Sequence, residues 1–270
     1  MSSKTYIIAW DGAIDNCLDI YNQLKDSGLD YKFHNVSSKD VDDETWVRTR
    51  DIRYYGHFHN ALRDFVEYTD KDVFIFNAGD AEYADYVTYT KRIEDFFDKD
   101  KNIGIFAPSI NFDPYSGDSS KIVDSVKHPE LYLSTMPNGI YVALSREVAT
   151  IMLAFIRWGI TNRSIKIPDM VSGWGLDYIY SAVAIYLNKK IYRDLIEFKH
   201  PRTTHYNSQI ADQEFRHMIS IFKDYCPELG FDRVKIQTIF DLIEKKVRGK
   251  ASFNLPIKAL YLNLKEDLDY

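Results

Sequence analysis

The stretch Val-Phe-Ile-Phe-Asn-Ala-Gly-Asp-Ala-Glu, residues 73–82, decides how we interpret this sequence. Its first four residues form a continuous apolar run, which is typical of a strand buried on both faces of a sheet. Gly79 then permits a tight turn and a close approach of the backbone. Asp80 and Glu82 follow at the carboxyl end of the predicted strand, where ligands bind in open α/β sheets. We therefore predict a buried strand that carries two carboxylates to a ligand site.

Strands and helices alternate on both sides of this stretch. Alternation of this kind implies an α/β fold with a mostly parallel sheet and helices on both faces. The polar segment 37–53 and the Ser-, Asp- and Pro-rich segment 110–129 are predicted to be loops. Expected strands are 5–10, 31–36, 73–76, 103–107, 131–135, 140–144 and 191–198, and expected helices are 14–24, 58–66, 86–97, 146–158, 178–187, 209–225 and 234–247. We place a domain boundary near residue 206, with a helical C-terminal extension over 207–270 packed on the domain formed by residues 1–206.

Composition excludes several classes of protein. The 270 residues include 34 Lys and Arg against 40 Asp and Glu, a net charge of −6. Because phosphate binding needs a basic footprint, we expect no nucleic-acid partner. Two cysteines cannot form a disulfide framework or a Cys-rich zinc module. The first apolar run is too short for a secretory signal and no run is long enough to cross a bilayer, so we expect a soluble, cytoplasmic protein.

The order of these elements and the position of the acidic motif resemble the GT-A class of nucleotide-sugar-dependent glycosyltransferases, in particular family 2. The resemblance extends over about residues 5–205 and implies a GT-A-like, Rossmann-type mixed sheet. In that class the acid-x-acid motif holds Mn²⁺ or Mg²⁺ on the donor diphosphate, which implies Asp80 and Glu82 as metal ligands. Carboxylate oxygens suit both cations. Taken without the resemblance, the same two acids would equally cap the helix that follows.

A second resemblance lies in Gly173-Trp174-Gly175-Leu176-Asp177. It is similar to the Gly-Trp-Gly loop of inverting members of the class, in which the acid that opens the next helix is the general base. The resemblance implies that Asp177 is this base and that Trp174 stacks on a sugar face, although the class often has Glu where Leu176 stands here. Helix capping by Asp177, with Trp174 in the core, is the structural alternative.

A histidine often follows the last sheet strand in this class as a further metal ligand. His200 and His205 both follow the strand expected at 191–198, and we prefer His200 because it lies nearer the strand end. A neutral imidazole is a better ligand for Mn²⁺ than for Mg²⁺.

The remaining candidates would bind the donor. Ala9, Trp10 and Asp11 end the first strand, where GT-A enzymes begin to hold the nucleoside, so Trp10 is expected against the base and Asp11 at the base edge or the ribose. Arg53, the last of three arginines in the polar loop, is a candidate for a bidentate phosphate contact. Asn60 follows a segment that faintly resembles a Gly-rich stretch of related enzymes.

The resemblance implies metal-dependent transfer of a sugar from a nucleotide-diphosphate donor, a UDP-sugar by default, to a hydroxyl of a glycan, glycolipid or glycoprotein. With Asp177 as base, the expected outcome is inversion, and retention stays open. Three other interpretations also stay open. They are a nucleotidyltransferase with the same metal–phosphate chemistry, a metal-dependent hydrolase that uses His57 and His59, and a non-catalytic sugar-binding module. The basic segment 231–265 favours a solvated helix face over contact with an anionic membrane.

Overall fold

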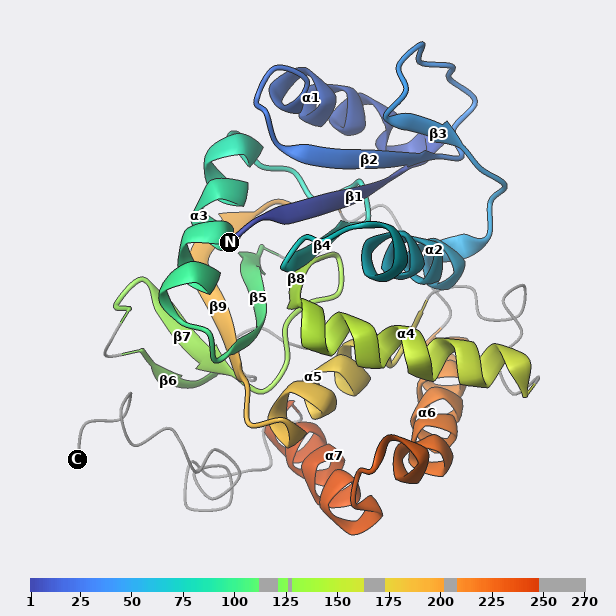
Figure 1. The fold of residues 1–270 in the computed structure, drawn as a ribbon, viewed down its shortest axis with the longest axis vertical. Helices are drawn as coiled ribbons and strands as arrows, with labels where there is room; N and C mark the ends of the chain where they lie inside the picture. The colour runs from blue at the N-terminus through green and yellow to red at the C-terminus, as the bar shows by residue number, and fades with distance from the viewer. Residues whose placement is uncertain (112–120, 126–127, 163–172, 202–207, 248–270) are drawn as a thin grey trace. The chain divides into compact units, whose positions relative to one another are not determined.

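The computed structural model describes residues 1–111, 121–125, 128–162, 173–201 and 208–247 (Figure 1). The chain forms two compact units, each built from several separate segments. The first comprises residues 1–101, 140–173 and 198–205, and the second comprises residues 102–139, 174–197 and 206–270. The predicted boundary near residue 206 and the extension over 207–270 remain predictions.

The first unit contains five neighbouring strands in the order β3-β2-β1-β4-β8. They are β1 (Ser3–Ala9), β2 (Asp30–Asn35), β3 (Trp46–Arg48), β4 (Val73–Asn77) and β8 (Tyr141–Ser145). β1 pairs in parallel with β2 and β4, β2 pairs in parallel with β3, and β8 runs antiparallel to β4. The carboxyl ends of the four parallel strands therefore lie along one edge of this sheet.

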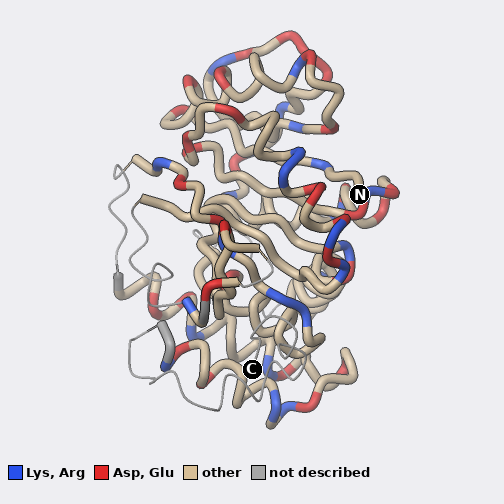
Figure 2. The backbone as a smooth tube through the Cα atoms, turned by 90° about the vertical axis from the view of Figure 1, so that its left-hand side faces the viewer, with Lys and Arg blue, Asp and Glu red and all other residues tan. Residues whose placement is uncertain are grey.

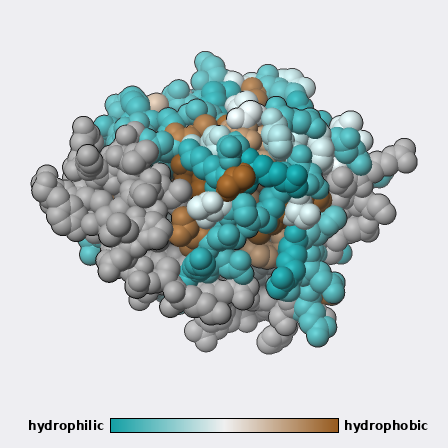
Figure 3. Space-filling model, turned by 90° about the horizontal axis from the view of Figure 1, so that it is seen from below, coloured by the Kyte–Doolittle hydropathy of each residue, from teal (hydrophilic) through white to brown (hydrophobic). Residues whose placement is uncertain are grey.

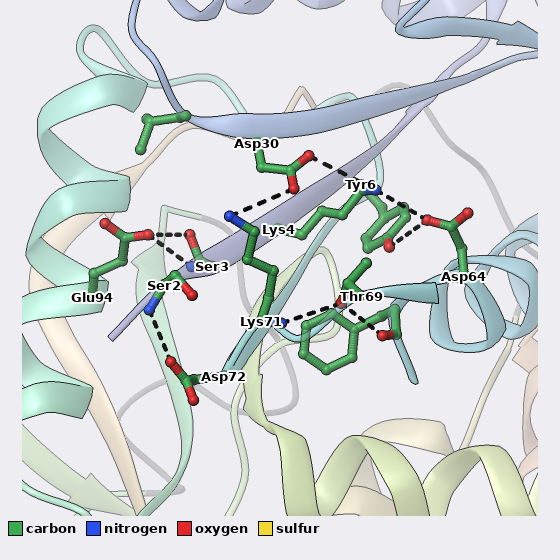
Figure 4. A network of polar contacts seen from close by, with 12 residues as sticks. Ser2, Ser3, Lys4, Tyr6, Asp30, Asp64, Thr69, Lys71, Asp72 and Glu94 are labelled. Atoms are coloured by element: carbon green, nitrogen blue, oxygen red, sulfur yellow. Dashed lines mark hydrogen bonds and ion pairs between the residues drawn. The ribbon is translucent and has the colours of Figure 1, made fainter. Parts of the chain in front are cut away.

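Four α-helices belong to this unit: α1 (Ile14–Leu24), α2 (Arg53–Tyr68), α3 (Tyr86–Lys99) and α4 (Arg146–Thr161). Contacts of β1 show that α2 and α3 lie on opposite faces of the sheet (Figure 4). The Ser3 hydroxyl donates to Glu94 of α3 at 2.8 Å, whereas the Tyr6 hydroxyl donates to Asp64 of α2 at 2.7 Å. Side chains an odd number of residues apart on a strand point to opposite faces, so β1 is covered on both sides.

Aromatic packing holds α2 against β4. The rings of Phe74 and Phe76 lie 5.6 and 5.0 Å from the ring of Phe58, each in an edge-to-face arrangement. Phe65 makes a similar contact with Phe74 at 5.5 Å. All four rings are fully buried, and edge-to-face pairs of this kind add stability beyond the area they bury. The apolar run that predicted β4 thus lies in the core of this unit.

The second unit contains the remaining strands and helices, with strand order β5-β9-β7-β6. The strands are β5 (Ile103–Ile110), β6 (Lys121–Asp124), β7 (Leu131–Ser134) and β9 (Lys190–Phe198), and β7 pairs antiparallel with both β6 and β9. The helices are α5 (Leu176–Tyr186), α6 (Ser208–Tyr225) and α7 (Arg233–Val247). α5 packs on both α6 and α7.

The structure confirms the α/β class and corrects two predicted loops. β3 lies within the segment 37–53 and β6 lies within the segment 110–129, both of which we expected to be without strands. β3 is only three residues long, and its Trp46 ring stacks on Phe33 of β2 at 4.2 Å. A strand this short has too few residues to show an alternating pattern, so tertiary packing decides it.

The described surface is mixed in character. Acidic and basic residues are interspersed along the backbone trace, with no large region of one charge among the described residues (Figure 2). The view from below shows hydrophilic side chains over most of the described face, with apolar atoms between them (Figure 3). Among the described residues, no helix combines the length and the apolar character needed to cross a membrane.

Candidate functional site

The loop that carries Asp80 is bent sharply at the carboxyl end of β4. Its turn begins where Asn77 Oδ1 accepts a hydrogen bond from the Gly79 amide at 2.8 Å. Gly79 has a φ of +91°, and a Cβ atom at this position would lie 2.0 Å from the carbonyl oxygen of Ile8 in β1. Only glycine fits both the conformation and the space. The strand and the turn therefore place the backbone of Gly79, the residue before Asp80, directly against β1.

Side chains from the segment after β1 hold this loop from outside. The Asn16 amide nitrogen donates to the carbonyls of Gly79 at 2.7 Å and Ala81 at 3.2 Å. The Trp10 indole nitrogen donates to the carbonyl of Ala78 at 3.1 Å. Trp10 was expected to stack on a nucleoside base, and the structure shows that its indole N–H is already engaged with the acidic loop. Stacking of a base on its ring remains a prediction.

Tyr86 and Lys199 make two further contacts with the loop. The Tyr86 hydroxyl of α3 donates to the Ala81 carbonyl, and burial raises the pKa of Tyr86, so the hydroxyl keeps its proton at neutral pH. Glu82 forms an antiparallel bridge with Lys199, through N–H···O contacts of 2.7 and 2.9 Å. This bridge brings the segment that follows β9 alongside the acidic loop.

The bridge sets His200 beside Asp80. Nε2 of His200 lies 3.2 Å from Oδ2 of Asp80, and each side chain is only 12% exposed. The other carboxylate oxygen of Asp80, Oδ1, is buried and has no hydrogen-bond partner among the described residues. Buried carboxylate oxygens in native proteins are nearly always satisfied by a donor, a water or an ion. An unsatisfied oxygen here indicates a position that a water, a ligand or an ion would complete.

These two residues fit a divalent cation that takes oxygen and nitrogen ligands. The fit is partial, because the described residues contain no group of three or more His, Cys, Asp or Glu side chains placed to hold a metal ion. The structure thus brings Asp80 and His200 together, whereas the side chain of Glu82 is exposed. The role of Glu82 as a ligand remains a prediction, as does the choice of Mn²⁺ or Mg²⁺. His205 lies outside the described residues.

Ala9 and Asp11, both predicted to meet the nucleoside, hold the segment after β2. The Ala9 carbonyl accepts hydrogen bonds from the amides of Val36 at 2.8 Å and Ser37 at 3.0 Å. The Asp11 carboxylate accepts from the amide and the hydroxyl of Ser38 at 2.6 and 2.8 Å. These hydrogen bonds lower the pKa of Asp11, which is therefore ionised at neutral pH. Contact of either residue with a nucleoside remains a prediction.

Arg53 and Asn60 both lie on α2. Arg53 opens the helix with a φ of +60°, and its guanidinium pairs with Asp51 at 3.0 Å. Asn60 is half-buried in the second turn of the helix. The Arg53 side chain is 55% exposed, so it is accessible to an anion. Binding of phosphate by Arg53 and of donor by Asn60 remain predictions.

Asp177 and Trp174 belong to the second unit. Gly175 precedes α5 in the left-handed conformation, with a φ of +95°. Asp177 lies in the first turn of α5, where its Oδ1 accepts from the Tyr178 amide at 3.0 Å. An acid in the first helical turn also interacts favourably with the helix dipole. The N-cap residue of α5 is Gly175 and no side chain caps the helix, so the alternative that Asp177 is the cap is wrong, whereas its role as a base remains a prediction. Trp174 is half-buried in the preceding turn, and the segment 163–172 lies outside the described residues.

Asn16 is one of the site residues that sequence reasoning missed. It is 63 residues away from Gly79 in the sequence. The parallel pairing of β1 with β4, which places Ile7 opposite Asn77, brings the two segments together. An asparagine at the start of an amphipathic helix carries no pattern that would single it out. Only the strand order could have identified it.

No protein-family model and no curated protein matches this sequence. Similar solved structures exist. S. aureus TarS, residues 1–349, is 10% identical over 97% of this chain and 78% of its own, with a TM-score of 0.52. A glycosyltransferase involved in the glycosylation of the major capsid of PBCV-1 is 12% identical over 81% of this chain and 98% of its own, with a TM-score of 0.34. UDP-glucose pyrophosphorylase complexed with UDP-glucose is 12% identical over 83% of this chain and 100% of its own, with a TM-score of 0.40. The likeness to TarS shows the fold alone, and it confirms that this chain has the expected GT-A-like α/β fold.

Proposed function

We propose that this chain is a metal-dependent glycosyltransferase that moves a sugar from a nucleotide-diphosphate donor to a hydroxyl acceptor. The observation that carries the proposal is the contact between Asp80 and His200 at the carboxyl end of β4, with Asp80 Oδ1 buried and unsatisfied among the described residues. A buried acceptor without a partner costs about 1–3 kcal/mol, and more when it is charged. A cation ligated by this oxygen would remove that cost. The GT-A-like fold supports the same interpretation.

Asp80 and His200 would hold the cation, with Glu82 as the third proposed ligand. When bound, a divalent cation offsets the negative charge that develops on a diphosphate leaving group. Trp10 contacts the same loop and Asp11 contacts Ser38 after β2, which is compatible with a nucleoside at the carboxyl ends of β1 and β2. A UDP-sugar is the donor we would test first. The acceptor would be a hydroxyl of a glycan, glycolipid or glycoprotein.

Asp177 is proposed to act as the general base. A sugar hydroxyl has a high pKa, so a positioned carboxylate has to take its proton as the oxygen attacks the anomeric carbon. The new carbon–oxygen bond forms while the bond to the diphosphate breaks, and the nucleoside diphosphate leaves with the electron pair. Attack from the opposite face inverts the anomeric configuration. This role is supported by the resemblance of the Gly-Trp-Gly loop and by the half-buried position of Asp177 at the start of α5.

The test is release of nucleoside diphosphate from a panel of nucleotide sugars, with Mn²⁺, with Mg²⁺ and with EDTA. We expect turnover that requires the cation and falls at least about 100-fold in Asp80→Asn and His200→Gln, because replacing a residue that only supports a metal ligand already costs about 10–100-fold. Asp177→Asn is expected to lower turnover to a similar extent without changing Mn²⁺ binding. The matched control is Asp19→Asn, because Asp19 is an exposed acid on α1.

Three outcomes would overturn the proposal. Undiminished turnover in Asp80→Asn would exclude the metal site. Binding of nucleotide sugars without turnover by any of them would indicate a sugar-binding module. Release of pyrophosphate from a nucleoside triphosphate and a sugar phosphate would indicate a nucleotidyltransferase. Glu82→Gln in the same assay tests whether the exposed acid is a ligand.

A further inference from the structure

We infer that Asn16 is the residue that positions Asp80, and that it sets the affinity of the site for its cation. This inference rests on the proposed function, because it assigns a role to Asn16 within the same site. Asn16 lies in the first turn of α1, and its side chain is half-buried against the acidic loop. It does not need to touch the cation, the donor or the acceptor for this role.

Asn16 contacts the acidic loop through two hydrogen bonds. An asparagine amide carries two N–H groups. The Asn16 nitrogen lies 2.7 Å from the Gly79 carbonyl and 3.2 Å from the Ala81 carbonyl. The Gly79 carbonyl belongs to the peptide group that precedes Asp80, and the Ala81 carbonyl belongs to the peptide group between Ala81 and Glu82, so one side chain holds the loop on both sides of Asp80. Rotation of the Asp80 backbone would break at least one of the two hydrogen bonds.

The other contacts of the loop restrain it at one side only. Trp10 holds the Ala78 carbonyl, two residues before Asp80, and Tyr86 holds the Ala81 carbonyl after it. Gly79 lies so close to the Ile8 carbonyl that no side chain fits between them, and this close packing restrains the turn before Asp80. Among these contacts, Asn16 alone spans Asp80. Its loss would leave the residues before and after Asp80 held by separate contacts, and none of these contacts would fix the two sides relative to each other.

Asn16 also links two parts of the proposed site. It follows Trp10 and Asp11 by only a few residues, and Trp10 and Asn16 together contact the carbonyls of Ala78, Gly79 and Ala81. The segment proposed to meet the nucleoside therefore also orients the acid proposed to meet the diphosphate. We expect a nucleoside diphosphate that orders this segment to strengthen Mn²⁺ binding.

The test compares Asn16→Leu and Asn16→Asp with Asn22→Leu. Both Asn16 variants remove the two N–H donors at nearly constant size. Asn22 is an exposed residue of the same type on the same helix and serves as the control. The Mn²⁺ dissociation constant is measured in the presence of UDP, from the electron paramagnetic resonance signal of free Mn²⁺. Turnover is measured as a function of Mn²⁺ concentration, and urea unfolding of each variant is followed by circular dichroism.

Residues that orient a metal ligand change metal affinity by about 10–100-fold when they are replaced. We expect Mn²⁺ binding to weaken at least about 10-fold in both Asn16 variants, with turnover restored by excess Mn²⁺, and to stay unchanged in Asn22→Leu. Binding within twofold of the unmodified chain would overturn the inference, as would a loss of turnover that excess Mn²⁺ does not restore. Asp80→Asn separates this failure from that of the proposed function. If Asp80→Asn also leaves Mn²⁺ binding unchanged, the metal site itself is wrong.

Discussion

Replacement of Gly79 by alanine should lower the free energy of unfolding more than the same replacement of a left-handed glycine that has open space around it. Gly79 has a φ of +91°, and its missing Cβ would meet the Ile8 carbonyl oxygen at 2.0 Å. Ordinary van der Waals contact begins at 3.4 Å, so the two atoms would have to separate by about 1.4 Å, the difference between these two distances. β1 is paired on both sides, with β2 and β4, and cannot move to make this room. The loop has to move instead.

The cost follows from what the loop loses. An L-residue in the left-handed region costs roughly 1–2 kcal/mol. A displaced loop also loses the hydrogen bonds from Asn16 and to Asn77, at 2.7 and 2.8 Å, each with a net contribution of about 0.5–1.5 kcal/mol. The free energy of unfolding should therefore fall by about 2–5 kcal/mol in Gly79→Ala. At roughly 2–4 °C per kcal/mol, the melting temperature should drop by at least about 4 °C.

Gly28→Ala is the matched control, because Gly28 also has a positive φ, +74°, and nothing lies within 4 Å of the added Cβ. This variant should lose only the backbone term of about 1–2 kcal/mol. Thermal unfolding of both variants is followed by far-ultraviolet circular dichroism. Equal stability of the two variants, within about 0.5 kcal/mol, would refute the close approach of Gly79 to β1.

Three further predictions concern residues away from the loop. Burial and the neighbouring His57 lower the pKa of His34 from 6.5 to about 3. The folded chain therefore keeps His34 neutral while the unfolded chain binds a proton, so its contribution to stability is complete above pH 6.5. This contribution falls by about 1.4 kcal/mol per pH unit below that value. The slope of urea stability between pH 7.5 and 5.5 should be smaller in His34→Phe, and an unchanged slope would contradict the assignment. Asp85→Ala should cost about 1 kcal/mol in thermal unfolding, because Asp85 caps α3 by accepting from the Thr88 amide at 2.9 Å. Asp64→Leu should cost about 1–3 kcal/mol, because the buried Tyr6 hydroxyl loses its acceptor, and an unchanged unfolding midpoint would exclude this hydrogen bond.

The sequence predicted most of the long elements because their apolar periodicity is local. The run 73–76 predicted β4, which extends to Asn77, and the helix expected at 209–225 is observed as Ser208–Tyr225. β3 and β6 were missed, since strands of three and four residues are too short to show periodicity. Their pairing with neighbours far along the chain is what makes them strands.

Candidate site residues could be proposed from the sequence where the signal was local, and they were missed where it depended on tertiary contacts. Asp80 could be identified because an acid after a buried strand is a pattern within ten residues. His200 could be proposed from its place after a strand, although its contact with Asp80 spans 120 residues. Asn16 and Tyr86 could not be identified, because their hydrogen bonds go to backbone carbonyls, which every residue carries. A sequence pattern cannot show which carbonyl a side chain will reach.

The bridge between Glu82 and Lys199 also determines when, during synthesis, Asp80 and His200 can come together. Asp80 is synthesised long before His200, and the imidazole reaches the carboxylate only after the chain beyond β9 has returned to the loop. During synthesis, the first hundred residues would carry the acid and its turn without His200, the second proposed ligand. If the proposed site binds a cation, the affinity should therefore appear only after the returning segment has formed its bridge with the loop.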